Sequence, residues 1–444
     1  MKGENYYRPA LRLFDGRMRV LIALMVVAVL AAGYRFILGL GATTNLSDQF
    51  PWGLWVAFDV ICGVALAAGG FTTAAVVYIF MEEKYHGLVR PAVLTALLGY
   101  VFVAVGLLAD LGKPWNIWHP IIYWPKHSAL FEVAWCVMLY LSILALEFAP
   151  AVFERLGWSK LHELWRLLVP PYVIFALTFF TYVMSHSIWW TLAAFAAVTA
   201  VAVFTPALVR SRPGTPIVLI IAGVIFSTAH QSSLGTLFLL MPDKLHPLWW
   251  TPLLPVNFFL SAVAVGFAMV IFEATISAQS FGLAEEEDAL TGLSRYLVYG
   301  LAIYFVVRVV DILARGQIMS LFSVLGLVFL AEMLVGVVLP LVILLKPGFR
   351  ASKWMRFSAA SLVVLGLVWN RFSTTLFAMH RPGTGWYFPS VEELVITTGI
   401  VCAIIFFYNI AVMLFPVLPA HEVEPSESSA EGAEPSHHGQ EAAV

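Results

Sequence analysis

Four ionisable side chains lie within or at the end of apolar stretches suited to a lipid bilayer: Asp59, Asp110, Glu132 and His230. An ionisable group in such a place costs free energy unless a partner satisfies it, and it is by default a functional candidate. Carboxyl and imidazole groups could exchange protons with a bound molecule. The structural alternative is a buried acid satisfied by a neighbouring Trp, Ser or backbone group.

Asp59 follows two tryptophans along one expected helix. Trp52 and Trp55 precede it on the same stripe, in a segment that opens with Phe50 and Pro51. Residues three or four positions apart share a helix face. The indole rings and the carboxyl are therefore expected to point to one side of the helix.

His230 begins a polar run inside the apolar stretch 226–240. Gln231 and Ser233 follow it, and Ser227 lies three residues before it. A serine three residues away lies beside the histidine on a helix. We expect these groups to find partners on a neighbouring helix or on a ligand.

A second set of polar side chains lies further along the chain. Arg308 and Asp311 are three residues apart and are expected to pair, Glu332 lies in a later apolar run, and Asn370 precedes Arg371. An internal ion-pair network and a proton path are equally compatible with this pattern. A path would also include Asp110.

Aromatic and histidine side chains gather in the segments between the apolar runs. One such segment holds Trp115, Trp118, His119 and Tyr123. The aromatic belt at a membrane interface accounts for most residues of this kind. The histidines concentrate on one side, which favours a docking surface or the mouth of a pocket for a lipid-soluble ligand.

The composition predicts a polytopic membrane protein. The chain has 444 residues, of which 61% are hydrophobic and only 12% charged. Its apolar runs reach the roughly 20 residues that cross a bilayer as a helix. We expect lipid around the protein and no nucleic-acid partner. Cys62, Cys136 and Cys402 lie far apart without CxxC spacing, so no metal site or disulfide is expected.

The apolar runs predict an all-α protein with about 12 transmembrane helices. The expected helices are 18–40, 52–81, 90–110, 128–150, 168–187, 189–209, 216–240, 253–276, 295–314, 319–345, 355–378 and 391–416. The stretch 168–209 is too long for one helix and is interrupted by Ser185, His186 and Ser187, so a hairpin is expected there. Ten helices remain possible if this hairpin is not formed.

Loop charges favour cytoplasmic N- and C-termini. With that orientation the inner segments hold 17 Lys and Arg residues and the outer loops hold five, as the positive-inside rule requires. Segment 1–17 is then a cytoplasmic N-terminus. Segment 420–444 is acidic and poor in large apolar residues, so a disordered cytoplasmic tail is expected.

The sequence leaves four function classes to distinguish: a haem carrier, a secondary transporter, a quinone-binding subunit and a structural membrane anchor. A haem carrier needs histidines at matching depth on facing helices, and only His230 is clearly deep. A secondary transporter would use the same acids, but matching mid-span breaks are not evident. A quinone site needs an apolar cleft, a hydrogen-bonding His or Tyr and an acid. Asp59, His119, Glu132 and His230 offer that set, and a structural membrane anchor is the remaining alternative.

Four separated motifs resemble one known family. They are FPWGLWVAFD at 50–59, HQSSLG at 230–235, LHPLW with TPLLP at 245–255, and YFPSVEEL at 387–394. Together they resemble the HybB-type branch of the NrfD/PsrC superfamily over nearly the whole chain. The inserted hairpin 168–209 departs from the hydrogenase subunits of that branch and leaves a relative in a sulfur-metabolism (DsrP-like) or multihaem complex open.

The resemblance implies two four-helix bundles and a role in quinone chemistry. The first bundle would span 52–240 around the hairpin 168–209, the second 253–378, with flanking helices 18–40 and 391–416. Members are membrane subunits of respiratory complexes that bind menaquinone or ubiquinone and hold no haem or iron–sulfur cluster. The expected setting is a bacterial or archaeal cytoplasmic membrane.

The resemblance also implies partners and site roles. An outer-face ferredoxin-like iron–sulfur subunit would exchange electrons with the quinone, next to catalytic subunits of hydrogenase, sulfur-reductase-linked or multihaem cytochrome type. Asp59 or Glu132 would exchange the quinol proton, and His119 or His230 would hold the quinone oxygen. The residues expected around the quinone are Trp52, Trp55, Trp115, His119 and Ser233. A proton path through Asp110, Arg308, Asp311, Glu332 and Arg371 is a further hypothesis.

Overall fold

The computed structural model describes Tyr6 and residues 15–125, 128–208, 217–380 and 385–419. Within these ranges the chain is helical, without β-strands, apart from one isolated bridge between Tyr6 and Pro419. The predicted tail 420–444 and most of segment 1–17 lie outside the described residues.

Eleven helices of the described part are long and apolar enough to cross a membrane, which confirms the prediction of an all-α polytopic membrane protein. They are Gly16–Leu38 (α1), Trp55–Ile79 (η1, α3, α4 and η2), Glu83–Asp110 (η3 and α5), Ala129–Leu156 (α7), Ser159–Ser185 (α8), Ile217–Leu239 (α10), Leu254–Phe281 (α11), Glu287–Ala314 (α12), Val324–Leu345 (α13, η6 and α14), Lys353–Met379 (α16 and η7) and Val391–Leu414 (α17). The remaining predicted helix is α9, Ile188–Leu208.

The first group of helices consists of the span η1–η2, α5, α7 and α10, which pack against one another. Small residues allow these backbones to approach closely. A Cβ at Gly70 would lie 2.6 Å from the Cβ of Ala96 in α5. At Gly235 of α10 a Cβ would lie 2.6 Å from the Leu254 carbonyl oxygen, where α11 begins.

The second group consists of α11, α12, the span α13–α14 and α16. Gly336 in η6 and Gly366 in α16 face each other, and a Cβ at Gly336 would lie 2.7 Å from the Gly366 Cα. The two groups meet along α11, which packs against both α4 and α10.

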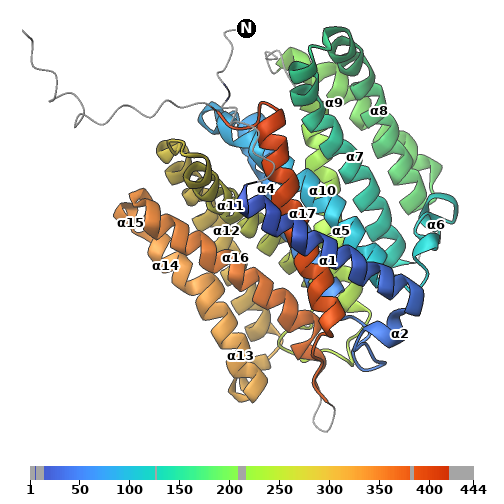
Figure 1. Ribbon diagram of the computed structural model, residues 1–444, viewed down its shortest axis with the longest axis vertical. Coiled ribbons are helices and arrows are strands. Elements are labelled where there is room, and N and C mark those ends of the chain that lie inside the picture. Colours follow the sequence, from blue (N-terminus) through green and yellow to red (C-terminus); the bar gives the residue numbers. More distant parts are fainter. Residues whose placement is uncertain (1–5, 7–14, 126–127, 209–216, 381–384, 420–444) are drawn as a thin grey trace, which may run out of the picture.

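Helices α1 and α17 pack side by side across the front of the two groups (Figure 1). Helix α17 also contacts η1 and α5, so the last span of the chain lies against the second and third. A capping box at Ser390 and Glu393 fixes the start of α17, as expected for a well-defined helix N-terminus.

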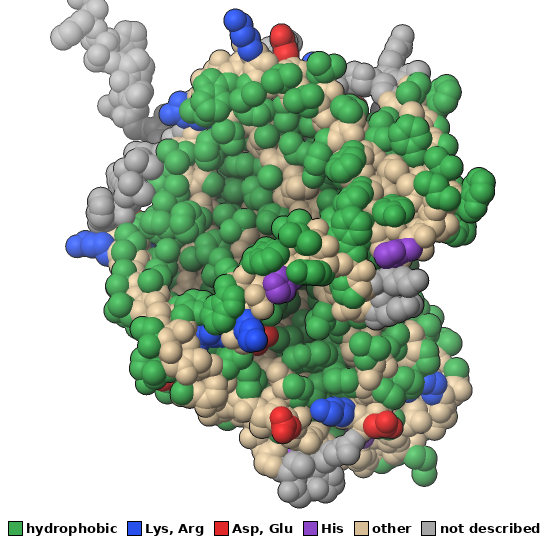
Figure 2. All heavy atoms as spheres, turned by 90° about the vertical axis from the view of Figure 1, so that its right-hand side faces the viewer, with side chains coloured by type: hydrophobic (Ala, Val, Ile, Leu, Met, Phe, Trp, Pro, Cys, Tyr) green, Lys and Arg blue, Asp and Glu red, His purple; other side chains and the backbone are tan. Residues whose placement is uncertain are grey.

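The stretch 168–209 forms the predicted hairpin of two helices, α8 and α9. His186 has a positive φ of 48° and ends α8. Helix α8 begins at Ser159, well before the predicted residue 168, because Leu161–Leu168 continues in the helix and buries Trp165. The hairpin lies at the edge of the first group, and hydrophobic side chains dominate the face shown in Figure 2.

Short segments close the two ends of the helical spans. We call the outer end the one that holds α2 (Leu40–Thr43), α6 (His119–Ile122), segment 240–253, η5 (Gln317–Phe322) and segment 385–390. This label follows the loop-charge prediction. The inner end holds η3 (Glu83–Leu88), segment 282–286 and α15 (Pro347–Ala351).

Candidate functional site

Asp59 lies in η1, a π-helical stretch from Trp55 to Cys62. Such turns are rare and are frequent at functional sites. The side chain is 4% exposed, and its Oδ2 accepts a 2.6 Å hydrogen bond from the Thr397 hydroxyl of α17. The Oδ1 has no partner among the described residues. Gly106 of α5 makes room, since a Cβ there would lie 2.7 Å from the Asp59 Cβ.

The two tryptophans before Asp59 have different surroundings. Trp55 is buried in a small cluster with Ala109, Ile396 and Ile400, and its Nε1 has no partner in the described part of the chain. Trp52 instead packs edge-on against Phe238 of α10, with ring centroids 5.1 Å apart. Trp55 therefore accompanies Asp59 toward α17, and Trp52 faces α10.

Glu132 lies in the first turn of α7 and contacts the polar run of α10. The Ser233 hydroxyl is 2.6 Å from Glu132 Oε1 and 2.7 Å from the Ala229 carbonyl oxygen. Glu132 is half-buried. The structure thus brings together Glu132 and Ser233, two of the predicted site residues.

His230 is fully buried between α5, α7 and α10. Its Nδ1 lies 2.9 Å from the Tyr100 hydroxyl, and its Nε2 has no partner among the described residues. The Tyr100 ring packs edge-on against Tyr140, with centroids 4.7 Å apart. Sequence analysis did not select Tyr100 or Tyr140. The available signal was a tyrosine hydroxyl in an apolar run at the depth of a buried histidine.

Gln231 accounts for part of the polar run. Its Nε2 donates a 2.9 Å hydrogen bond to the Val64 carbonyl oxygen in α3 (Gly63–Leu66). The span that contains Val64 changes between π- and α-helix and contains turns at Ala67 and Ala68. The amide of Gln231 therefore satisfies a backbone group of an irregular helix.

His119 and Trp115 are not brought to the buried acids. His119 begins α6, where its ring packs against Trp118 at 4.4 Å and Tyr123 at 5.3 Å between centroids. Trp115 is 67% exposed at the outer end. Neither has a recorded contact with Asp59, Glu132 or His230.

Asp110 ends α5 beside a buried arginine that sequence analysis did not select. Arg35 of α1 donates from Nε to the Ala109 carbonyl oxygen and from Nη2 to the Leu111 carbonyl oxygen, both at 2.6 Å. Its guanidinium therefore satisfies C-terminal carbonyls of α5, where a positive charge is favourable.

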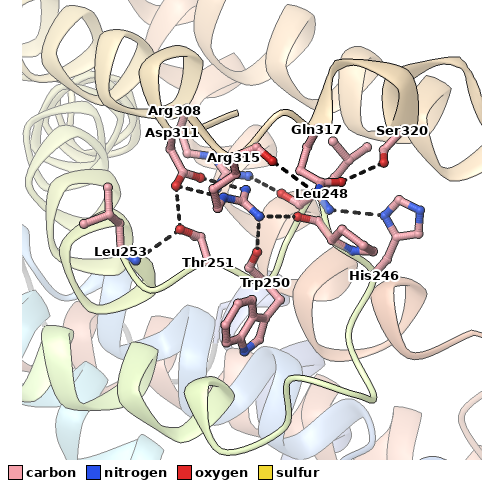
Figure 3. A network of polar contacts seen from close by, with 11 residues as sticks. His246, Leu248, Trp250, Thr251, Leu253, Arg308, Asp311, Arg315, Gln317 and Ser320 are labelled. Carbon is pink, nitrogen blue, oxygen red and sulfur yellow. Dashed lines mark hydrogen bonds and ion pairs between the residues drawn. The ribbon is translucent and has the colours of Figure 1, made fainter. Parts of the chain in front are cut away.

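The polar cluster of α12 differs from the expectation (Figure 3). Asp311 pairs with Arg315, whose Nη2 lies 2.8 Å from Asp311 Oδ2, and accepts a 2.6 Å hydrogen bond from Thr251. Arg308 donates to the Leu248 carbonyl oxygen at 3.0 Å. The predicted Arg308–Asp311 pair is wrong, because the Arg308 guanidinium binds the Leu248 carbonyl oxygen and Asp311 pairs with Arg315, four residues later in the chain.

Glu332 and Arg371 meet through an amide. Asn370 donates to Glu332 Oε1 at 2.6 Å and accepts from Arg371 Nη1 at 2.7 Å. Trp249 Nε1 donates to Glu332 Oε2 at 3.2 Å, and a cavity of about 30 Å³ adjoins Glu332. These contacts form a connected network inside the second group.

Two further acids in the spans were missed by sequence analysis. Glu147 of α7 faces Gly223 of α10, where a Cβ would lie 3.0 Å from the carboxylate oxygen. Glu273 of α11 contacts Thr95 and Tyr408. Both acids lie in helices predicted to span the membrane. A carboxyl group inside an apolar run was therefore the sequence signal that could have identified them.

A cavity of about 270 Å³ opens at the outer end, lined by Asn45, Gln49, Phe50, Trp386 and Tyr387 among others. A second of about 50 Å³ adjoins Glu273 near the inner end. Asp59, Glu132 and His230 line neither of these nor the cavity beside Glu332.

Among the described residues no group of three or more His, Cys, Asp and Glu side chains could hold a metal ion. The three cysteines are buried and free.

Known proteins match this chain over most of its length. A protein of Nitratidesulfovibrio vulgaris is 37% identical over 410 residues, covering 90% of this chain and 93% of the relative. The probable Ni/Fe-hydrogenase 2 b-type cytochrome subunit of Escherichia coli is 34% identical over 406 residues, covering 89% and 91%. The menaquinone reductase integral membrane subunit of N. vulgaris is 25% identical over 420 residues, covering 88% of each.

A family comparison gives the same result. The family described as polysulphide reductase, NrfD, matches residues 42–378. This range includes the site residues of both helix groups and confirms the resemblance drawn from the four motifs. The chain belongs to the NrfD family of integral membrane proteins.

Proposed function

We propose that this chain is the quinone-interacting subunit of a membrane redox complex. Its relatives are named as membrane subunits of a hydrogenase and of a menaquinone reductase, which supports a membrane subunit of a redox complex. The quinone itself, menaquinone or ubiquinone, is our further step.

The observation that carries the proposal is the half-satisfied carboxyl of Asp59. It is buried in a π-helical turn and has one oxygen bound by Thr397. Its Oδ1, like the indole N–H of Trp55 four residues earlier in the same helix, has no partner among the described residues. Buried polar atoms without partners are uncommon in native proteins and call for an explanation. A quinol hydroxyl could donate to Asp59 Oδ1 and accept from the Trp55 indole N–H. A quinone carbonyl could accept from the indole N–H and from Asp59 when that carboxyl is protonated.

Three residues of the first group, Asp59, Glu132 and His230, can take complementary roles. Reduction of a quinone consumes two protons, so an acid must exchange protons with the ring oxygens. Asp59 and Glu132 are the acids, and His230 Nε2, which has no partner within the described ranges, could hold an oxygen. Tyr100 fixes the His230 ring through Nδ1, as orienting hydrogen bonds do at other histidine sites.

The residues do not fit a haem held by two histidines. The printed name of the E. coli relative includes a b-type cytochrome. In the described part of this chain His230 is the one fully buried histidine. A haem of that type needs a second histidine on a facing helix.

We propose the outer end as the docking face for an iron–sulfur partner and the catalytic subunits. Exposed aromatic residues support this: Trp115, Trp118 and Tyr123 near α6, and Trp386 and Phe388 near the start of α17. Aromatic residues are enriched at protein interfaces. The direction of electron flow would follow the partner.

In the second group we propose a structural role for the Asp311 network. Arg315 donates to the Pro247 and Trp250 carbonyl oxygens at 2.8 Å each while it pairs with Asp311. These bonds join segment 246–253 to α12 (Figure 3). A structural connection of this kind explains why the charged pair of Asp311 and Arg315 lies in the protein, without requiring a proton path.

Asp59→Asn tests the proposed function, with Asp48→Asn at an exposed outer position as its matched control. In membranes that hold the assembled complex, Asp59→Asn should reduce quinone-linked turnover by about 100-fold or more, the size of a general acid–base contribution. Turnover with an artificial dye should stay unchanged, and Asp48→Asn should resemble the unmodified protein. Full quinone-linked turnover in Asp59→Asn would favour a structural anchor or a transporter.

A further inference from the structure

Helix α17 presents a line of polar side chains from Asp59 to the outer end. Thr397 binds Asp59 directly at 2.6 Å. Glu393 lies one helical turn closer to the outer end on the same face, since residues four apart are neighbours on a helix. Helix α17 and η1 both begin at the outer end, so Glu393 lies beside Gly53 as Thr397 lies beside Asp59.

Glu393 is more deeply buried than a capping residue needs to be. It is 0% exposed. Its Oε2 accepts from the Ser390 amide at 2.9 Å, which is the capping bond, and from the Asn45 amide at 3.1 Å. Its Oε1 accepts the hydroxyl hydrogen of Tyr387. One carboxylate oxygen therefore serves the helix start and the other serves a titratable side chain.

Tyr387 joins Glu393 to the cavity of about 270 Å³ at the outer end, which it helps to line. The Leu54 amide donates to its hydroxyl oxygen at 2.9 Å. Burial, then the hydrogen bond to Glu393, raises the pKa of Tyr387 above its usual value. The hydroxyl therefore keeps its proton at neutral pH and can pass one on only as it receives another.

The backbone around Gly53 is shaped for this contact. A Cβ at Gly53 would lie 2.5 Å from the Tyr387 hydroxyl oxygen and 2.8 Å from Glu393 Oε1. Every other residue type carries a Cβ, so only glycine lets the start of the second span approach this pair.

We propose that Thr397, Glu393 and Tyr387 form a proton relay between Asp59 and the outer cavity. This inference rests on the proposed quinone site, and it adds the route by which protons enter or leave that site.

Each step moves one proton and changes no oxidation state. Protonated Asp59 gives its proton to the Thr397 oxygen, and the Thr397 hydroxyl proton passes to Glu393, directly or through one water. Glu393 then gives a proton to the Tyr387 oxygen as the Tyr387 proton passes to water in the cavity. Asp59 ends ionised, the relay side chains regain their initial states, and the reverse order delivers a proton.

Other charged groups surround the middle of the relay. Asp110 of α5 is close enough to Glu393 for their negative charges to repel, and it is close enough to Arg35 for their opposite charges to attract.

Thr397→Val tests the relay, because it removes the hydroxyl and nearly keeps the volume. Thr398→Val is the matched control, since Thr398 is the next residue of α17 and is exposed. In the assembled complex Thr397→Val should lose at least about 10-fold in quinone-linked turnover, less than a direct proton donor would contribute. Dye-linked turnover should not change, and Thr397→Ser should restore the rate.

Rescue separates proton transfer from packing. Formate or azide, as small weak acids, should restore part of the quinone-linked turnover of Thr397→Val and of Tyr387→Phe. Tyr299→Phe, at an exposed tyrosine of α12, should show neither loss nor rescue. A loss in Thr397→Val that no weak acid restores would indicate a packing role and overturn the relay.

The two proposals fail separately. Full turnover in Thr397→Val with an inactive Asp59→Asn would reject the relay and leave the quinone site. Full turnover in Asp59→Asn would reject the quinone site and the relay with it.

Discussion

Single residues in the first helix group are held by few contacts, and those contacts define their chemistry. His230 has one ring nitrogen bound to Tyr100 and the other without a partner in the described chain. Gln231, next in sequence, is bound to a backbone carbonyl of α3. The polar run therefore divides into a packing residue and a residue with a free nitrogen that faces the protein interior.

Tyr100→Phe should impair the histidine without unfolding the protein. It removes the hydrogen bond to His230 Nδ1, which is worth about 1 kcal/mol net, and keeps the ring that packs on Tyr140. We expect a several-fold rise in the Michaelis constant for quinone and little change in thermal stability. Tyr299→Phe, at an exposed site of α12, is the control. An unchanged Michaelis constant for quinone in Tyr100→Phe would show that His230 does not bind the quinone.

At the scale of elements, glycine contacts position the helices. Gly336 faces Gly366 across the interface between η6 and α16. Helices that approach so closely in a membrane depend on small side chains at the contact.

Gly336→Ala should destabilise this interface by about 1–3 kcal/mol, the usual range for overpacking. Gly33→Ala in α1 is the control, because a Cβ at Gly33 meets nothing within 4 Å. There the better helix propensity of alanine leaves stability unchanged or raised. Thermal unfolding of the detergent-solubilised protein measures the stability of both variants, Gly336→Ala and Gly33→Ala. Equal melting temperatures would contradict the close contact.

Segment 246–253 should respond to pH through His246. Burial lowers the pKa of His246 below its usual 6.5, and its Nδ1 accepts a 3.3 Å hydrogen bond from the Leu248 amide. The folded state thus favours neutral imidazole. This contribution is present above pH 6.5 and is lost as the pH falls through 6.5, because the unfolded chain then binds a proton that the folded chain resists.

The melting temperature should therefore fall between about pH 7 and about pH 5, and His246→Asn should flatten that part of the curve. Asparagine keeps an oxygen that can accept the Leu248 hydrogen bond but does not titrate in this range. Identical slopes for the two proteins would show that His246 is not responsible.

At the scale of the whole molecule, sequence predicted the helices well and their rotations poorly. Apolar run length sets where a span lies, so predicted 391–416 matches α17 at Val391–Leu414. The predicted start at 319 was early, because Gln317–Phe322 forms a 3₁₀ turn before α13. Polar extensions were also missed, as at the start of α8, since hydropathy alone does not register them.

The candidate site was only partly predictable for the same reason. The residue type and the depth within a predicted span indicated Asp59, Glu132 and His230 as site residues. The contact between Glu132 and Ser233 joins two of the predicted site residues. Partners depend on the rotation of each helix about its axis, so Thr397 and Tyr100 were missed. The position of a loop residue such as His119 depends on how the outer segments fold. The structure places the His119 ring against the exposed Trp118 ring, away from the buried acids.

The central claim is that a quinone binds beside Asp59, and photolabelling tests it most directly. The purified complex would be irradiated with a photoreactive menaquinone analogue, and the labelled peptides identified by mass spectrometry. We predict saturable labelling of η1 and the facing parts of α5 and α17, displaced by menaquinone and reduced in Asp59→Asn. Labelling that does not saturate, or that falls on the exposed faces of α8 and α9 alone, would contradict the claim.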